Sequence, residues 1–278
     1  MPSQWAFEGG ALTEVARLPD RAQLYGDALF ETMLWTGCNL ALKTYHLTRL
    51  LYGCERLDIG LVPSEAKKHF EELERALARS HRGHSLAVRL SCTPIAESRG
   101  YLRSSQSGAA LSSTITPFET REGSRVHLGI SGVQLACQPV IAGIKHANRL
   151  EQVLAASELA RAGYEDGLML NTDGVLVCTT RANIYCLIDE VWHTPVIDRS
   201  GVAGTRRAWL FDSALGLGLS LKESELTLTS LERANAVMIS NALRGFVSVE
   251  AIAGRPYQHH ESTDFISHAY QAYLSRES

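Results

Sequence analysis

The 278-residue chain has no excess of charge of one sign and no long apolar run. Its 27 basic and 30 acidic side chains are mixed along the sequence, with a formal net charge of -3. This balance argues against a nucleic acid or a membrane surface as the main partner, because both attract concentrated basic charge. No apolar stretch approaches the roughly 20 residues that span a bilayer, and the first residues, MPSQWAFEGG, lack the features of a signal peptide. We therefore expect a cytoplasmic protein that acts on a small molecule.

Cysteine is scarce, and the sequence has no internal repeat and no low-complexity segment. The six cysteines are scattered, with no CxxC pair and no grouping with histidine: Cys38, Cys54, Cys92, Cys137, Cys178 and Cys186. This pattern argues against a metal centre and predicts reduced, mostly buried thiols. With 45% hydrophobic residues, the chain can bury a proper core, so we expect a globular protein.

Strand and helix patterns follow one another along the chain, which predicts a mixed α and β protein. After a strand-like start, strand patterns span residues 28–35, 39–42, 85–92, 110–115, 125–145, 167–171, 175–178, 183–188, 191–194, 219–222 and 235–243. Helical patterns span residues 45–61, 63–81, 148–162, 206–216 and 228–233. Ser64 is a plausible cap of the second helix. The polar loop 116–125 predicts a domain boundary near residue 120, with domains at 1–119 and 120–278.

Lys145 is a candidate nucleophile. It follows the apolar residues VIAGI and precedes a helical pattern whose Leu150, Val153 and Leu154 we expect to face a core. A partly buried lysine has a lowered pKa, because its charged form is desolvated, and its amine then attacks carbonyl groups and shuttles protons. The alternative is a solvated lysine at the end of a strand, which is the more common state of this residue.

Three other features suit an anion. GVAGTRR, residues 201–207, leads into a predicted helix whose first N–H groups are free, and ISNAL, residues 239–243, ends a strand in hydroxyl and amide groups. Arg49 lies in the apolar pattern of a helix, where a buried arginine needs an anionic partner. Ordinary turns and an exposed arginine are the alternatives. Together with Lys145, these features are what a phosphate-bearing aldehyde cofactor requires.

Several motifs occur in an order that resembles one enzyme family. They are YGDALFET, HLTRLL, GIKHANRLEQVLA, EDGLMLNTDGVL, RANIY, TP, GVAGTRR and ISNAL. Their order is similar to that of the fold-type IV pyridoxal-phosphate enzymes, the class of branched-chain and D-amino-acid aminotransferases, over about residues 5–255. Within that class, KHANRLEQVLA is similar to the lysine segment of 4-amino-4-deoxychorismate lyases, K-H-x-N-R-L-E-Q.

The resemblance implies an α+β protomer of two domains, a small N-terminal α/β sandwich and a larger C-terminal pseudo-barrel, with the active site between them and a homodimer around it. It implies pyridoxal 5'-phosphate as the cofactor, bound covalently by Lys145, which then shuttles the proton. Residues implied to hold the cofactor are Arg49, Cys178, Thr205 and Arg206 through their backbone, Ser240 and Asn241. Residues implied to face the substrate are Thr32, Arg99, Tyr101 and Arg149.

Cys178 departs from the family pattern. The family carries a glutamate there, which keeps the pyridine nitrogen protonated, whereas this chain reads GVLVCTTRANIY. A thiol holds a positive charge less well, so the cofactor becomes a weaker electron sink. Transamination should suffer more than an elimination that aromatises its product. We therefore expect a carbon-oxygen lyase that converts 4-amino-4-deoxychorismate to 4-aminobenzoate and pyruvate in folate synthesis. A class IV aminotransferase and a catalytically altered or cofactor-free relative are the alternatives.

Overall fold

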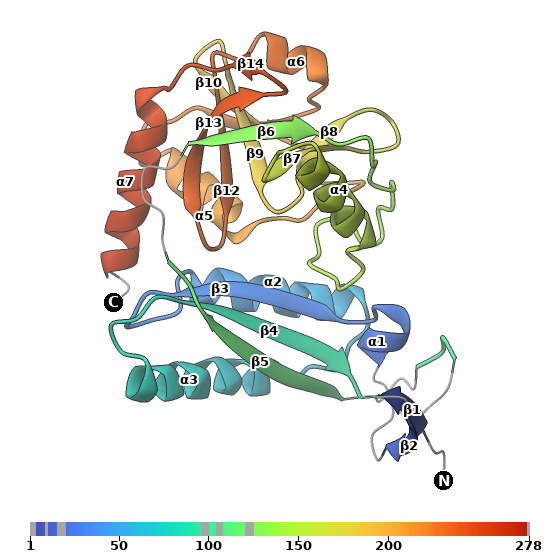
Figure 1. Ribbon diagram of the computed structural model, residues 1–278. Coiled ribbons are helices and arrows are strands. Elements are labelled where there is room, and N and C mark those ends of the chain that lie inside the picture. The colour runs from blue at the N-terminus through green and yellow to red at the C-terminus, as the bar shows by residue number, and fades with distance from the viewer. Residues whose placement is uncertain are drawn as a thin grey trace.

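A computed structural model describes residues 4–8, 11–15, 21–95, 100–103, 108–119 and 125–276. The chain forms two layered halves that lie one above the other, with the N-terminal half below in Figure 1. At the N-terminus, the antiparallel strands β1 (Gln4–Glu8) and β2 (Ala11–Val15) pair with each other, and a short helix, α1 (Arg21–Tyr25), follows. In the described part of the chain, no helix is long and apolar enough to cross a membrane.

The lower half is a three-stranded antiparallel sheet with two helices on one face. The sheet has the order β3-β4-β5. Its elements are β3 (Leu29–Trp35), α2 (Lys43–Arg56), α3 (Pro63–Ser80), β4 (Leu86–Pro94) and β5 (Ala109–Pro117). Alternate side chains of β3 point to opposite faces of the sheet. Leu29 and Met33 pack with the two helices, whereas Leu34 packs against helices of the upper half. β3 is therefore covered on both faces.

The upper half is one curled sheet with four helices around it. The strand order is β11-β10-β9-β12-β13-β6-β7-β8, and β14 pairs with β13. The strands are β6 (Val126–Ile130), β7 (Asp166–Leu170), β8 (Leu176–Thr179), β9 (Asn183–Ile188), β10 (Val191–Pro195), β11 (Leu221–Ser224), β12 (Ala236–Asn241), β13 (Gly245–Ile252) and β14 (Arg255–Pro256). The helices are α4 (Leu150–Arg161), α5 (Thr205–Ala214), α6 (Leu228–Glu232) and α7 (Glu261–Arg276). Leu176 bridges to Leu226, just past β11, so the two ends of the sheet approach each other. This closure makes the expected pseudo-barrel.

Most predicted strands and helices are confirmed, and three local predictions are wrong. Residues 39–42 form no strand, because Leu42 adopts a left-handed backbone conformation (φ 54°) from which α2 begins. Ser64 caps no helix, because Pro63 occupies the first turn and Val62 is the N-cap. The strand expected over 125–145 ends at Ile130. The helix α7 and the strands β13 and β14 had no predicted counterpart. The proposed boundary at residue 120 lies outside the described residues, so it stays a prediction.

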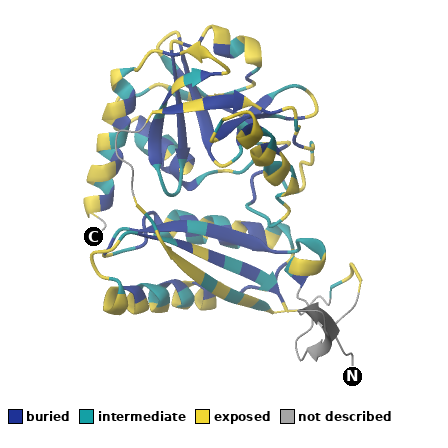
Figure 2. Cartoon of the chain, in the orientation of Figure 1, coloured by how far each residue is buried: buried dark blue, intermediate teal, exposed yellow. Residues whose placement is uncertain are grey.

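The apolar face of α4 does not pack into a core, contrary to the prediction. Leu150, Val153 and Leu154 are 69%, 56% and 53% exposed, and Figure 2 shows much of α4 in the exposed colour. The helix instead buries the small Ala155 together with Leu159. Small side chains let a helix lie close to a sheet. When a helix has two apolar faces, the periodicity of the sequence does not determine which of them packs against the sheet.

Close packing of α4 on the sheet yields a testable prediction. A Cβ atom at Gly167 in β7 would lie 2.5 Å from Leu159 Cδ2 and 2.8 Å from the carbonyl oxygen of Gly129 in β6. Because backbone must shift, Gly167→Ala is expected to lower the free energy of unfolding by about 1–3 kcal/mol, measured by urea titration. Gly108→Ala is the matched control, because its Cβ would meet nothing nearer than 3.9 Å. Equal stability of the two variants would contradict the close approach.

Candidate active site

Lys145 lies in an irregular segment between β6 and α4 that runs beside the start of β3. The N–H of Phe30 donates to the carbonyl oxygen of Lys145 (3.0 Å), and the N–H of Ala147 donates to that of Ala28 (2.8 Å). The Lys145 amine lies 4.2 Å from the centre of the Phe30 ring. A lysine of the upper half is thus held against the sheet of the lower half.

The residues that follow Lys145 hold this segment in place. The Asn148 amide donates to the carbonyl oxygen of Gly26 (3.1 Å), in the turn before β3. The Arg149 guanidinium donates to the carbonyl oxygens of His146 (2.9 Å) and Ile144 (3.3 Å), on either side of the lysine. The motif KHANR therefore has a structural function, because it braces the backbone around the lysine.

The pKa of the Lys145 amine is lowered to about 7. Desolvation is the largest cause, and the guanidinium groups of Arg49, Arg149 and Arg89 act in the same direction, whereas the Glu31 carboxylate opposes them. An amine with this pKa is in large part unprotonated at neutral pH and is able to attack a carbonyl carbon. The Lys145 side chain is half-buried, which favours the nucleophile over the solvated-lysine alternative.

A buried carboxylate holds Arg49 in place. Glu31, on the helix-covered face of β3, accepts from Arg49 Nε (2.9 Å) and from Arg49 Nη2. It also bonds His46 Nδ1 (2.5 Å), and these contacts lower the pKa of the Glu31 carboxyl to about 2 although burial opposes them. Arg49 Nη1 donates to the carbonyl oxygen of Ala203 (2.9 Å), and His46 Nε2 bonds the Thr205 hydroxyl (3.3 Å). The network connects β3 and α2 to the start of α5.

The turn before α5 leaves backbone N–H groups available to an anion. Gly204 is the N-cap of α5, and no side chain caps the helix. A Cβ atom at Gly204 would lie 1.9 Å from Asn183 Oδ1, while the Asn183 amide donates to the carbonyl oxygen of Val202 (2.9 Å). Only glycine fits this close approach. The N–H groups of Thr205 and Arg206 therefore open a helix without a side-chain acceptor, which is an environment that favours phosphate.

Two of the predicted phosphate-binding residues use their side chains elsewhere. The Arg206 guanidinium donates to the carbonyl oxygen of Ala242 (2.5 Å) and lies 4.8 Å from the centre of the Tyr270 ring. The Ser240 hydroxyl bonds the Tyr185 hydroxyl (2.9 Å), and both residues are buried. The assignment of the Arg206 backbone to a phosphate stays a prediction.

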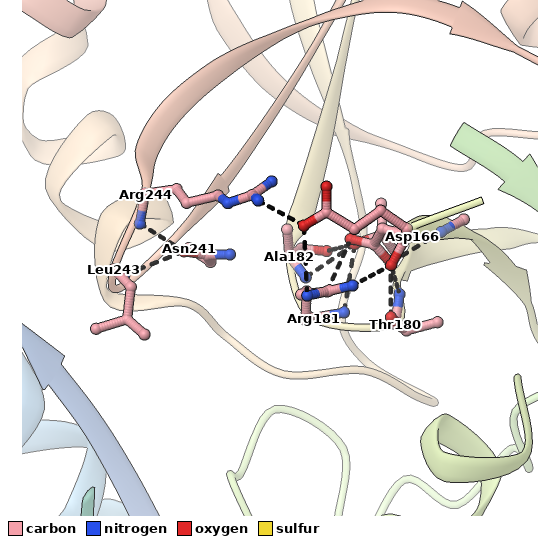
Figure 3. Close-up of polar contacts among 10 residues, drawn as sticks. Asp166, Thr180, Arg181, Ala182, Asn241, Leu243 and Arg244 are labelled. Carbon is pink, nitrogen blue, oxygen red and sulfur yellow. Dashed lines mark hydrogen bonds and ion pairs between the residues drawn. The ribbon is translucent and has the colours of Figure 1, made fainter. Parts of the chain in front are cut away.

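Asn241 closes the turn between β12 and β13. Its Oδ1 accepts from the N–H groups of Leu243 (3.0 Å) and Arg244 (2.9 Å), as Figure 3 shows. Arg244 in turn bonds Glu165 at the start of β7 (2.5 Å). Because Oδ1 already accepts these two bonds, a phosphate would be bound by the amide N–H groups of Asn241.

The Cys178 thiol has a cation as its main charged neighbour. Burial raises the pKa of this thiol to about 12, and Arg149 is the group that opposes the shift most. The nearby carboxylate, Asp166, accepts from Thr179 Oγ1 (2.8 Å) and from Thr180 N (3.0 Å) and Oγ1 (2.6 Å) (Figure 3). Asp166 thereby shapes the turn after Cys178. It is bound by its own donors and does not stand in for the missing glutamate.

Arg89 is a functional candidate that sequence reasoning missed. It lies opposite Thr32 in the β3–β4 pair, and its guanidinium lies 3.9 Å from the centre of the Phe30 ring. Within the described residues, no carboxylate forms an ion pair with it. Side chains of Phe30, Thr32 and Arg89 share one face of the sheet, which is the face that Lys145 contacts. Thr32 shares this face, and its assignment to the substrate stays a prediction.

Tyr101 is not brought to Lys145 within this chain. It is 87% exposed, and its ring lies 5.3 Å from that of Tyr25. Arg21 donates to the carbonyl oxygens of Gly100 (2.8 Å) and Tyr101 (2.9 Å) and so fastens this segment to α1. Arg99 lies outside the described residues. Both substrate-binding assignments stay predictions.

Glu31 and His46 were missed as well, although the sequence contains a usable signal. His46 and Arg49 are three residues apart and share one face of α2. Glu31 interrupts the apolar residues of β3 at a position that alternation assigns to the same buried face as Leu29 and Met33. A buried acid opposite a His/Arg pair predicts an ion pair, but only tertiary structure shows that they meet.

The arrangement fits an aldehyde that carries a phosphate. It offers an amine of lowered pKa, an uncapped helix start preceded by an obligatory glycine, and an arginine that links the two. The described residues contain no group of three or more His, Cys, Asp or Glu that could hold a metal ion. A lysine near a helix start without a side-chain cap, between a small α/β layer and a curled sheet, is typical of the class IV aminotransferase fold.

Comparison with known proteins agrees with this class. The family model of the class IV amino-transferases matches residues 28–252, so the chain belongs to that family. It is 29% identical over 240 residues to the aminodeoxychorismate lyase of Vibrio harveyi, which covers 85% of this chain and 87% of that protein.

Solved structures give the same picture. The 4-amino-4-deoxychorismate lyase of Pseudomonas aeruginosa superposes with a TM-score of 0.82 at 30% identity, over 94% of this chain and 96% of that one. An aminotransferase of Brucella abortus, bound to PLP, has a TM-score of 0.81 at 13% identity, over 99% and 100% of the two chains, and supports the fold alone. The predicted fold class is confirmed.

The environment of Lys145 predicts its reactivity. Because only the unprotonated amine reacts, its rate of acylation by acetic anhydride should rise to half its maximum near pH 7, the lowered pKa of this group. Competitive labelling followed by mass spectrometry measures the rate at each pH. The exposed Lys67 and Lys68 serve as internal references for an amine in water. A Lys145 rate that follows theirs at every pH would show that the amine is solvated.

Proposed function

We propose that this protein is a pyridoxal-phosphate-dependent carbon-oxygen lyase that converts 4-amino-4-deoxychorismate to 4-aminobenzoate and pyruvate, a step of folate biosynthesis. The Lys145 amine, with its lowered pKa and its position between the two halves of the molecule, is the observation that carries this proposal. The lyases from Vibrio harveyi and Pseudomonas aeruginosa, similar over most of the chain, support the choice of reaction.

Lys145 binds the cofactor and moves the proton. Bound pyridoxal phosphate supplies a conjugated ring that accepts the electron pair left by the departing proton. Lys145 takes the proton from the amine-bearing ring carbon of the substrate. The bond between the ring and the ether oxygen then breaks, and the enolpyruvate fragment takes a proton on its methylene carbon to become pyruvate. The sum of the two products equals the substrate, so no oxo-acid acceptor is needed.

The remaining predicted residues bind and orient. Phosphate is held by the backbone N–H groups of Thr205 and Arg206, by Arg49 and by the Ser240–Asn241 segment. The substrate's carboxylates are attracted by Arg149 and by Arg89, which has no ion-pair partner among the described residues. The positive charge of these two arginines suits a substrate that carries two carboxylates. Arg99 and Tyr101 stay candidates for the same task.

A class IV aminotransferase is the second candidate, because the family as a whole bears that name. Cys178 argues against it. A neutral thiol beside Arg149 does not hold a proton on the ring nitrogen, and transamination depends most on that proton. Elimination is driven in addition by aromatisation of the product.

We also propose two domains joined near residue 120, and a homodimer. The exposed apolar side chains of α4, together with the exposed Leu102 beside Tyr101, form surface that a second copy is able to cover. The cytoplasmic location stays a prediction.

The decisive experiment begins with an absorbance spectrum. The protein incubated with pyridoxal phosphate is expected to gain a visible band, and borohydride reduction should fix the cofactor on Lys145, as located by mass spectrometry. Lys145→Ala should remain unlabelled, whereas Lys222→Ala, at an exposed site, should behave like the unsubstituted protein. Incubation with 4-amino-4-deoxychorismate should then release 4-aminobenzoate without added 2-oxo acid. If the protein binds the cofactor and turns coloured but releases no 4-aminobenzoate from the substrate, the lyase proposal is rejected.

Cys178→Glu tests the electron-sink argument. A carboxylate at this position should favour protonation of the cofactor's ring nitrogen, change the visible spectrum and its pH dependence, and raise any transamination with an amino acid donor. Cys38→Glu is the matched control, because it places the same charge at an exposed cysteine. An unchanged spectrum together with unchanged transamination would show that residue 178 does not face the ring nitrogen.

A further inference from the structure

A fully buried carboxylate lies where the two halves of the molecule meet. Glu31 is 1% exposed and His46 is 0% exposed, and neither residue contacts solvent to any useful extent. An ionised carboxylate in such a place is costly unless charged partners and hydrogen bonds satisfy it. Here both oxygens have partners, and the pKa of Glu31 is about 2, so the group is charged at neutral pH. A residue of this kind would be replaced by an apolar one at little cost if packing were its only purpose.

The partners of Glu31 engage all three nitrogens of the Arg49 guanidinium. Nε and Nη2 donate to the two carboxylate oxygens, and Nη1 donates to the carbonyl oxygen of Ala203. The planar fork of an arginine held in this way has one orientation only. The bond from Nη1 to Ala203 holds this guanidinium next to the turn that begins α5.

His46 carries the same constraint to the first residue of α5. Burial lowers the pKa of its ring to about 4, so the ring is neutral at physiological pH. A neutral ring has one N–H group and one acceptor. Since Nδ1 faces the carboxylate of Glu31, Nδ1 carries the hydrogen, and Nε2 accepts from the Thr205 hydroxyl (3.3 Å). The Thr205 hydroxyl is thereby bound to His46 and does not cap α5.

We propose that Glu31 and His46 are positioning residues for the phosphate end of the cofactor site: through Arg49 and Thr205 they fix the lower half against the start of α5. This inference rests on the proposed function, because it takes the ligand of the site to be a phosphate ester. Neither residue touches the reacting atoms. Their effect is to hold donors from α2 and α5 at one place, although these donors belong to different halves of the chain.

Charge and orientation make opposite predictions for the isosteric variant Glu31→Gln. Loss of the carboxylate leaves one more positive charge beside the phosphate site, and charge alone would tighten phosphate binding. Loss of the orientation of Arg49 would weaken phosphate binding. A glutamine amide has only one oxygen that accepts hydrogen bonds, and its NH2 group faces N–H donors of Arg49 or His46, so it cannot hold both side chains. The positioning role predicts that orientation outweighs charge.

The test compares pyridoxal phosphate with pyridoxal, which lacks the phosphate. Titration of the visible absorbance of each cofactor gives its dissociation constant. Glu31→Gln is expected to weaken pyridoxal phosphate relative to pyridoxal by about tenfold or more, the effect of one charge-assisted hydrogen bond. Because Glu31 also raises the pKa of Lys145, its effect on the amine reaches both cofactors and cancels in this ratio. Glu31→Asp keeps the charge but shortens the side chain, so it should also weaken pyridoxal phosphate alone. Glu55→Gln, exposed on α2, is the matched control and should change neither.

Circular dichroism and thermal unfolding show whether each variant folds. If Glu31→Gln does not fold, His46→Phe carries the test, because it keeps the ring volume and removes both hydrogen bonds. Equal or tighter binding of pyridoxal phosphate relative to pyridoxal by the folded variants would overturn the positioning role, and so would an equal loss for pyridoxal. An unsubstituted protein that binds neither cofactor would instead overturn the proposed function. The two failures are therefore distinguishable.

Discussion

The site depends on positive charge that gathers between two halves of the chain and is balanced by one buried carboxylate. Desolvation and neighbouring guanidinium groups lower the pKa of the Lys145 amine to about 7, and Glu31 limits the excess of charge. In water these groups would repel one another weakly and would stay protonated. The reactivity of the lysine is therefore a property of the closed interface.

One strand makes this interface possible. β3 packs Leu29 and Glu31 against α2 on one face, while Phe30 contacts Lys145 on the other. Alternation along a strand puts the residue that orients the arginine directly beside the residue that contacts the lysine. The residues proposed to bind phosphate and the amine of Lys145 are thus connected through two consecutive residues of β3, Phe30 and Glu31.

The sequence anticipated much of the architecture, and it failed where packing chose between equal patterns. The strands of β7 to β10 and the helices α2, α3 and α5 follow from periodicity because long, regular apolar patterns have few alternatives. α4 was oriented wrongly, because Leu150 and Val153 form an apolar face that the small residues opposite displaced from the sheet. The place of Tyr101 also depends on tertiary contacts, since Arg21 fastens its segment to α1, and its assignment to the substrate stays a prediction.

By itself the sequence determined the class of chemistry, because a lysine, a glycine-led helix start and a family-specific KHANR motif are read from residue type and order. It also identified Cys178 as a departure from the family pattern, which predicts a weaker electron sink. Only the tertiary structure decided which charges meet. The ion pair of Glu31 with Arg49, the bond from His46 to Thr205 and the lowered pKa of Lys145 all depend on burial and on distances between segments far apart in the chain. Local sequence does not determine such distances or the desolvation of a side chain, because both arise only in the assembled fold.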